Sequence, residues 1–268
     1  VQFPDRSVVV KLPRRGPNGD AARLMGAYDR ERVAYASLLS RDLPVPRCYD
    51  IIEVEHGPAF VLEDLTAHRA VDQIEGLSGE DALAVVDALV VCHTGIPVSV
   101  AADLGVRSAT PAGFSPESLT KGLALVPDGD RFAQLLERRG ELVARFGSLS
   151  DPVLCHGDPR ADNLVLGPQV KLFDWQQIAI QTGEADLAWL MATSLSPMVR
   201  TVVEAEVVTR YASAVGRSAD ESWERYRLAM IVPGLAVLLL AQRSASGRLQ
   251  ELVSVSIDRI ASAAADHL

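Results

Sequence analysis

The sequence predicts the α+β fold class, because strand patterns concentrate in the first 65 residues and helical patterns fill most of the rest. Residues 7–12 form a β-branched run that ends at Pro13. Two further apolar runs, 48–55 and 59–63, flank the turn His56-Gly57-Pro58 and predict a hairpin. From residue 78 onward, apolar residues recur at helical spacing, interrupted by short strand patterns between residues 153 and 173.

The first strand carries Lys11 near its end, directly before Leu12 and Pro13. A lysine at this position is most often a solvated strand end, so the residue alone says little about function. A loop rich in Gly and Pro, residues 14–20, follows it, and Asp20 is a plausible N-cap for the next helix.

That helix has one apolar stripe, which we expect to be buried. Its members are Leu24, Tyr28, Tyr35 and Leu38. Glu31 lies in the same stripe and needs a partner, because an unpaired buried carboxylate is costly. Lys11 is the natural candidate. The alternative is that the helix is phased differently and Glu31 is a surface residue.

The remaining chain predicts helices over residues 78–92, with Ser78 as the cap, and over 131–146. Between them, 95–127 is expected to form loops and short turns. Further helices are expected over 185–194, 197–215, 221–243 and 246–265, with a break near Pro233-Gly234. The apolar stripe of the last helix is interpreted as core, and its members are Leu249, Leu252, Val253 and Ile260.

The most informative stretch is 153–176, in which apolar strands end on polar loops. The first strand leads into the loop 156–163, which contains His156, Asp158 and Asn163, and a strand over 170–173 ends on Asp174. Oxygen ligands at the ends of adjacent strands can converge on one point. Such a set of ligands can bind a hard cation, which in turn binds a phosphate. The alternative is a pair of ordinary turns, because Asp and Asn are common turn residues.

The spacing His-x-Asp-x-x-x-x-Asn, followed eleven residues later by Asp174, resembles the aminoglycoside phosphotransferase and choline kinase group, which are relatives of the protein kinases. The sequences Phe-Asp-Trp-Gln-Gln at 173–177 and Gly-Glu-Ala-Asp-Leu-Ala at 183–188 are similar to the ecdysteroid-kinase-like branch and its bacterial counterparts. Several matches in the correct order make this a specific signal.

The resemblance implies a bilobal, protein-kinase-like fold. Residues 1–65 would form a small nucleotide-binding lobe with the hinge, and residues 66–268 a mainly helical catalytic lobe. Glu63, Asp64 and Leu65 would form the hinge, where backbone groups bind the adenine edge. Only six residues precede the first strand, so the family's first two strands and their phosphate-covering loop are expected to be missing. The start at Val1 without Met favours a trimmed chain over a true loss of these strands.

The resemblance also implies the roles of the site residues. Asp158 would orient the acceptor hydroxyl and take its proton, and Asn163 and Asp174 would bind Mg²⁺. Lys11 would contact the α- and β-phosphates of ATP, and Glu31 would orient Lys11. His156 is expected to be structural, and Asp186 to brace the catalytic loop or cap a helix. Arg160 could balance phosphate charge or pair with Asp162.

Bulk properties narrow the function classes. A net charge of −9 and the lack of a basic stripe argue against nucleic acid and acidic membranes as partners. Three widely spaced cysteines suit a reducing cytoplasm. The longest uncharged run, 228–242, is shorter than the roughly 18–20 residues that a membrane span needs.

The leading hypothesis is therefore an ATP- and Mg²⁺-dependent phosphotransferase that acts on a hydroxyl group of a small molecule. The acceptor could be a cationic aminoglycoside or amino alcohol, or a sterol, macrolide or sugar. The alternative is a non-catalytic nucleotide- or ligand-binding module that lacks the phosphate-covering loop. A metal-dependent hydrolase would need more histidine ligands than five scattered ones supply.

Overall fold

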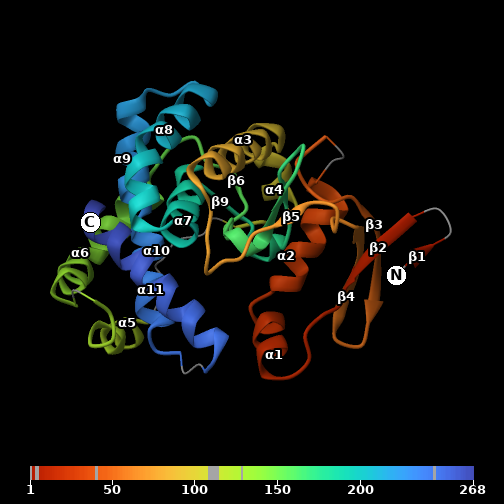
Figure 1. Ribbon diagram of the computed structural model, residues 1–268, viewed down its shortest axis with the longest axis horizontal. Helices are drawn as coiled ribbons and strands as arrows, with labels where there is room; N and C mark the ends of the chain where they lie inside the picture. The colour runs from red at the N-terminus through yellow and green to blue at the C-terminus, as the bar shows by residue number, and fades with distance from the viewer. Residues whose placement is uncertain (1, 4–5, 40–41, 108–114, 128, 244–245) are drawn as a thin grey trace.

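The computed structural model describes residues 2–3, 6–39, 42–107, 115–127, 129–243 and 246–268. It confirms the predicted α+β class: an antiparallel sheet with its helices lies at one end, and a bundle of helices lies at the other (Figure 1). Short strands from the middle of the chain lie between these two parts (Figure 1). The polar loops of residues 153–176 are carried on these central strands.

The N-terminal sheet has four antiparallel strands in the order β1-β2-β4-β3. They are β1 Gln2–Phe3, β2 Arg6–Lys11, β3 Cys48–Val54 and β4 Gly57–Glu63. The predicted hairpin is present, and β2 pairs with β4 so that Lys11 lies opposite Phe60. The two-residue strand β1 was not predicted, and it pairs Gln2 with Ser7.

The helical segment after β2 differs from the single helix that the sequence predicts. It consists of α1 Pro17–Leu24, α2 Ala27–Val33 and a π-helical turn, η1 Ala34–Leu38. The break lies at Gly26, which adopts a left-handed conformation that glycine tolerates without steric cost. Gly16 rather than Asp20 occupies the N-cap of α1, so the predicted cap is wrong.

The break at Gly26 also changes which side chains are buried. Leu24 precedes the break and is 90% exposed, so its assignment to the buried stripe is wrong. Tyr28, Tyr35 and Leu38 follow the break and are buried as predicted. Glu31 is fully buried among them, which confirms the phase of the helix at the residue that matters for the site.

Two small sheets position the central loops. One has the order β5-β7-β8, with β5 Arg69–Ala70, β7 Leu164–Leu166 and β8 Lys171–Leu172. The other pairs β6 Val153–Cys155 with β9 Ala179–Gln181. Short 3-10 turns, η3 Ala161–Asn163 and η4 Trp175–Gln177, follow the strands β6 and β8 along the chain. The strand-loop-strand pattern predicted for 153–176 is confirmed.

The helical part contains nine helices among the residues that the structure describes. They are α3 Gly79–Gly95, α4 Val98–Asp103, α5 Pro116–Leu123, α6 Gly129–Gly147, α7 Glu184–Ser194, α8 Pro197–Ala214, α9 Ala219–Ala229, α10 Ile231–Leu240 and α11 Arg248–His267. Ser78 caps α3 through a capping box with Asp81, as expected. The region 95–127 contains the helices α4 and α5 rather than only loops, and its residues 108–114 lie outside the described part.

Two further expectations are corrected. The break between α9 and α10 lies at Met230 rather than at Pro233-Gly234. Pro233 fits within the first turn of α10, where a helix has no partner for the missing N–H. Leu249 is 56% exposed and does not belong to the core, whereas Ile260 on the same helix is buried.

Helix α7 lies at the centre of the helical part, with α8, α9, α10 and α11 around it (Figure 1). Leu187, Ala188, Leu190 and Met191 are all fully buried. A helix that is apolar on most of its surface needs such complete enclosure. Helix α7 follows β9 and contacts η3, so it lies beside the loops that the central strands carry.

Within the described residues, no helix is both long and apolar enough to cross a membrane.

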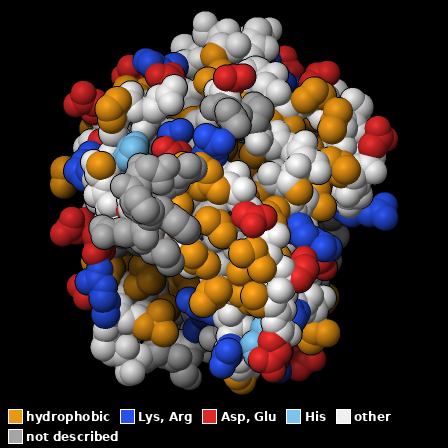
Figure 2. All heavy atoms as spheres, turned by 90° about the vertical axis from the view of Figure 1, so that its right-hand side faces the viewer, with side chains coloured by type: hydrophobic (Ala, Val, Ile, Leu, Met, Phe, Trp, Pro, Cys, Tyr) orange, Lys and Arg blue, Asp and Glu red, His pale blue; other side chains and the backbone are white. Residues whose placement is uncertain are grey.

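Hydrophobic side chains gather on the face of the molecule at its N-terminal end (Figure 2). Val10, Ile52 and Val54 of the N-terminal sheet are exposed.

Candidate active site

Lys11 brings three elements together at the end of β2. Its Nζ atom lies 2.6 Å from Oε1 of Glu31 and 2.8 Å from Oδ1 of Asp174. Burial raises the pKa of the Glu31 carboxyl, and the neighbouring charge of Lys11 opposes that rise. The predicted partnership of Lys11 and Glu31 is therefore present. It extends to the acidic loop, which consists of Asp174 and the turn η4 that follows it.

Asp174 has a backbone conformation that few non-glycine residues adopt. Its φ is 64°, in the left-handed region, which costs about 1–3 kcal/mol and often marks functional sites. The following residues are held by α2: Arg30 donates from Nε to the carbonyl oxygen of Gln176 at 2.8 Å. Gln176 in turn donates from Nε2 to Oε2 of Glu31 at 3.0 Å. Helix α2 and the acidic loop thus position each other.

Asp158 lies in the loop after β6, where several groups contact its carboxylate. Asn163 donates from Nδ2 to Oδ2 at 3.0 Å, and Trp189 donates from Nε1 to Oδ1 at 2.7 Å. The Nε atom of Arg160 lies 3.3 Å from Oδ2, and it also lies 3.1 Å from Asp162. Burial raises the pKa of Asp158 to about 6, although Arg160 and Trp189 oppose this shift.

His156 supports the loops rather than facing a substrate. It is buried, and its Nε2 donates to the carbonyl oxygen of Phe173 at 2.9 Å. Its Nδ1 accepts the backbone N–H of Asp158, and its ring packs against Trp175. Burial lowers the pKa of this imidazole. This geometry agrees with the structural role expected for His156.

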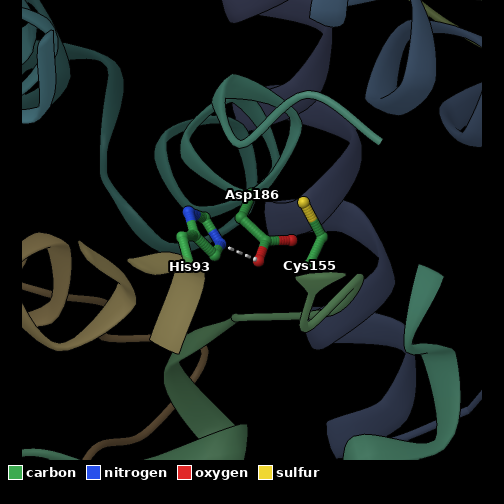
Figure 3. Close-up of side chains that lie close together, drawn as sticks. All are labelled: His93, Cys155 and Asp186. Atoms are coloured by element: carbon green, nitrogen blue, oxygen red, sulfur yellow. Dashed lines mark hydrogen bonds and ion pairs between the residues drawn. The ribbon is translucent and has the colours of Figure 1, made fainter. Parts of the chain in front are cut away.

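Asp186 at the start of α7 holds the backbone of the loop 156–163, which is named the catalytic loop after its expected role. Its Oδ2 accepts from the N–H of His156 at 2.7 Å, and its Oδ1 accepts from the N–H of Gly157 at 2.9 Å. Nε2 of His93, on α3, lies 3.0 Å from the same carboxylate (Figure 3). Nδ1 of His93 contacts the hydroxyl group of Tyr211. The bracing role expected for Asp186 thus agrees with the structure.

His93, Cys155 and Asp186 lie close enough together to suggest a metal site (Figure 3). However, the polar atoms of His93 and Asp186 already have protein partners. Burial raises the pKa of the Cys155 thiol, and its sulfur lies 3.4 Å from the carbonyl oxygen of Thr182. A neutral thiol is a poor metal ligand, so this cluster is better explained as a buried hydrogen-bond network.

Two adjoining cavities share Lys11 and Asp174. One, of about 630 Å³, has an apolar lining from both sides, including Val9 and Leu62 of the sheet and Val165 and Phe173 of the central strands. The other has a volume of about 360 Å³. It is lined by charged and polar side chains, and these include Lys11, Arg14, Asp158, Arg160, Asp174 and Gln177. An apolar cavity that opens onto a charged one suits a ligand with a flat ring and an anionic tail.

The expected hinge residues border the apolar cavity in part. Glu63 and Leu65 line it, whereas Asp64 is not among its lining residues. The side chain of Glu63 accepts from the backbone N–H of Arg47, and that of Asp64 accepts from the N–H of Thr66. Both carboxylates therefore accept hydrogen bonds from the protein's own backbone.

Asn163 and Asp174 have the ligand chemistry that a hard cation needs. The amide nitrogen of Asn163 faces Asp158, so its oxygen is the end that remains for a metal. The two loops are tied together because the N–H of Phe173 donates to the carbonyl oxygen of Asn163. Carboxylate and amide oxygens are suitable ligands for Mg²⁺. The residues present therefore fit the expected ion.

Several residues of this site were missed from the sequence. Trp189 contacts Asp158, Gln176 contacts Glu31, and His93 with Tyr211 supports Asp186. His93 carried one signal, since it follows Leu89 by four residues and so falls on the buried face of its helix. Trp189 carried none, because an aromatic residue in an apolar helix usually indicates core.

Comparisons with known proteins identify the family and the fold of the chain. A family model described as the phosphotransferase enzyme family matches residues 1–229. Among curated proteins, none matches the chain. Solved structures that share the fold include an aminoglycoside 2′-phosphotransferase-IIIa in complex with GDP, at 15% identity and a TM-score of 0.59. That match covers 98% of this chain and 94% of the other.

Two further structures have the same architecture. A microcompartment-associated aminopropanol kinase is 16% identical with a TM-score of 0.57, and the match covers 98% of this chain and 85% of the other. A choline kinase from Streptococcus pneumoniae is 16% identical with a TM-score of 0.54, with coverages of 98% and 88%. At these identities the likeness shows the fold. The predicted bilobal, protein-kinase-like fold is confirmed.

Proposed function

The chain belongs to the phosphotransferase enzyme family and is a kinase of small hydroxylated molecules, and we propose that ATP is its phosphoryl donor and Mg²⁺ its metal. In this proposal Asp158 is the catalytic base. The family match supports the reaction class, and the charged cavity supports the roles of individual residues.

The observation that carries the proposal is the position of Lys11 between Glu31 and Asp174. The ion pair with the buried Glu31 holds the amine at the junction of the two cavities. Phosphoryl transfer requires little covalent chemistry from the protein, but it requires positioned positive charge along the phosphates. A lysine fixed between a helix carboxylate and a metal-binding carboxylate supplies such a charge.

We place the adenine ring in the cavity of about 630 Å³. Val9 and Leu62 would cover one face of the ring, and Val165 and Phe173 the other. The hinge at Glu63 and Leu65 would bind the ring edge with backbone groups, with the side chain of Asp64 remaining outside. The phosphates would then extend toward Lys11, Arg14 and Arg160.

Asn163 and Asp174 would hold Mg²⁺ beside the phosphates. When bound, the ion neutralises phosphate charge that would otherwise repel the attacking oxygen. Asp174 would exchange its contact with Lys11 in part for the ion, since both lie at the same carboxylate. Lys11 would keep its contact with Glu31 and turn toward the α- and β-phosphates.

In the reaction, the acceptor hydroxyl would hydrogen-bond to the carboxylate of Asp158. The hydroxyl oxygen forms the new bond to the γ-phosphorus, while the bond between that phosphorus and the ADP oxygen breaks. The hydroxyl proton passes to Asp158. Arg160 lies beside Asp158 and would stabilise the charge on the transferred group, rather than serving only Asp162.

The branch of the family, the lobe boundary and the cellular location are proposed from the sequence. The motifs at 173–177 and 183–188 favour a place near the ecdysteroid-kinase-like branch. The boundary between residues 65 and 66 would separate the nucleotide-binding lobe from the catalytic lobe. The three free cysteines, Cys48, Cys92 and Cys155, support a cytoplasmic location. The proposal includes small hydroxylated acceptors of any charge.

The proposal is tested by calorimetric titration of ATP into the protein with and without Mg²⁺. Wild-type protein is expected to bind ATP in the presence of Mg²⁺, and Asp174→Asn and Lys11→Met to bind it at least tenfold more weakly. Lys121→Met, which removes an exposed lysine of α5, is the matched control and should bind as the wild type does. Equal ATP affinity in all four proteins would contradict the proposed site.

A panel of amino alcohols, aminoglycosides, macrolides and sugars, incubated with γ-labelled ATP, would then identify the acceptor. If the protein binds ATP but transfers phosphate to no acceptor, and Asp158→Asn binds ATP as the wild type does, the non-catalytic module is favoured instead.

A further inference from the structure

Three residues on one side of α7 hold the catalytic loop. Asp186 accepts from the backbone N–H groups of His156 and Gly157, and Ser194 accepts from the N–H of Ala161 at 2.9 Å. Trp189 lies between them on the helix and donates from Nε1 to Oδ1 of Asp158 at 2.7 Å. Asp186 and Ser194 therefore fix the backbone of the loop, whereas Trp189 reaches the side chain of Asp158.

Each carboxylate oxygen of Asp158 accepts a hydrogen bond from a different donor. Oδ1 receives the indole N–H of Trp189, and Oδ2 receives the amide of Asn163 at 3.0 Å with Arg160 nearby. The terminal torsion of an aspartate is broad, so a carboxylate held at one oxygen only can still rotate. A donor at each oxygen fixes the plane of the carboxylate, and therefore fixes which lone pairs face the acceptor.

We propose that Trp189 is a positioning residue, whose indole N–H fixes the carboxylate of Asp158 in the orientation that receives the acceptor proton. The inference rests on the proposed function, because it assigns Trp189 a task only if Asp158 is the base. Charge-assisted N–H···O⁻ hydrogen bonds are short and strong, and 2.7 Å lies at the short end of their range.

The other tryptophans have different environments, which provides internal controls. The chain has three tryptophans. Trp175 donates from Nε1 to the backbone carbonyl of Leu172, and Trp223 packs against Tyr226 on α9. Trp189 is thus the indole whose N–H meets a side-chain carboxylate of the site.

The contact itself is tested by NMR of protein labelled with ¹⁵N at the indole nitrogens, which gives one signal for each of the three tryptophans. Trp189→Phe identifies the signal of Trp189 by its loss. Asp158→Asn replaces a charged acceptor with a neutral one, so the Trp189 signal is expected to move upfield while the Trp175 and Trp223 signals stay in place. An unmoved Trp189 signal would overturn the inference, whether or not the protein is active.

The positioning role is tested by replacing Trp189 with 3-benzothienylalanine, which keeps the shape of the indole and replaces its N–H with sulfur. We expect kcat to fall about ten- to a hundredfold, because misoriented catalytic groups lose rate on this scale. KM for ATP should not change, since Trp189 is not among the residues that line the apolar cavity. The melting temperature should fall only slightly, because Asp158 keeps the hydrogen bond from Asn163. Trp223→Phe removes an indole that packs against Tyr226 and His267, and it should leave kcat unchanged.

The outcomes separate the inference from the proposed function. If the wild type transfers phosphate and the benzothienyl protein does so at the same rate, the positioning role is wrong and the proposed function stands. If the wild type transfers no phosphate, the proposed function fails. The positioning role then fails with it, and the NMR result reports only whether the contact exists.

Discussion

The amine of Lys11 lies 2.6 Å from the carboxylate of Glu31 and 2.8 Å from that of Asp174, so one cation joins the N-terminal sheet, α2 and the acidic loop. Glu31 is fully buried, whereas the Lys11 side chain is 29% exposed. Removal of the lysine would leave a buried carboxylate without its cation, and such a group is expensive.

Lys11→Met is therefore expected to lower the free energy of unfolding by about 1–3 kcal/mol, discounted because the lysine is partly exposed. The double variant Lys11→Met/Glu31→Gln removes the orphaned charge and should recover part of this loss. Urea denaturation of the wild type, the two single variants and the double variant measures the coupling. Additive losses would contradict a direct interaction between the two side chains.

Gly157 links the catalytic loop to the acidic loop through close packing. Its φ is +82°, and a Cβ atom there would lie 2.1 Å from the carbonyl oxygen of Gln177. Gly157→Ala is expected to destabilise the protein by at least about 1–2 kcal/mol and to abolish most activity, because both loops must shift. Gly140→Ala is the control: the position is helical and has open space around it, so a gain of about 0.5–1 kcal/mol is expected. Thermal denaturation measures the stability change of each variant. Equal changes in Gly157→Ala and Gly140→Ala would contradict close packing at Gly157.

The cluster of His93, Cys155 and Asp186 is expected to need no metal. Its carboxylate accepts two backbone N–H groups and contacts His93, and the thiol is neutral because burial raises its pKa. Neither EDTA nor Zn²⁺ should change the melting temperature of the wild type in the absence of nucleotide. His93→Ala should lower it by several degrees, because Asp186 loses a buried partner. A melting temperature that falls with EDTA and returns with Zn²⁺ would identify a structural metal instead.

The carboxyl group of Asp158 should titrate abnormally in the metal-free protein. Burial raises its pKa to about 6, so the group is protonated below that pH and ionised above it. Trp189→Phe should raise this pKa further, because the indole hydrogen bond favours the ionised form. NMR titration of ¹³C-labelled aspartate carboxyls measures both values. A titration at the ordinary pKa of aspartate, near 4, would show that the carboxylate is solvated.

The sequence was most informative about the residues of an ordered motif and about one buried ion pair. Asp158, Asn163 and Asp174 could be singled out because their order and spacing resemble those of the phosphotransferase family, whereas the strand-loop-strand pattern alone also fits ordinary turns. Lys11 and Glu31 could be paired because a glutamate on a buried helix face needs a cation. The Lys11–Glu31 pair needed only helical periodicity and one electrostatic requirement, whereas the acidic residues needed an ordered motif.

Other features depend on tertiary contacts that local patterns do not encode. The helix over 17–38 divides at Gly26, and Leu24 becomes exposed, because a left-handed glycine changes the direction of the chain. Trp189 meets Asp158 only because α7 packs beneath the catalytic loop, which lies 31 residues earlier in the chain. A tryptophan among apolar helix residues gives no sign of that contact.

Asp158 is proposed as the base of an ATP-dependent phosphotransferase. The most direct measurement compares wild-type protein and Asp158→Asn for transfer of the labelled γ-phosphate of ATP to the acceptor found in the panel, beside ATP affinity from calorimetry. The variant is expected to bind Mg²⁺ and ATP about as tightly as the wild type but to transfer phosphate at least about a hundredfold more slowly. An Asp158→Asn protein that transfers phosphate at the rate of the wild type would show that Asp158 is not the base.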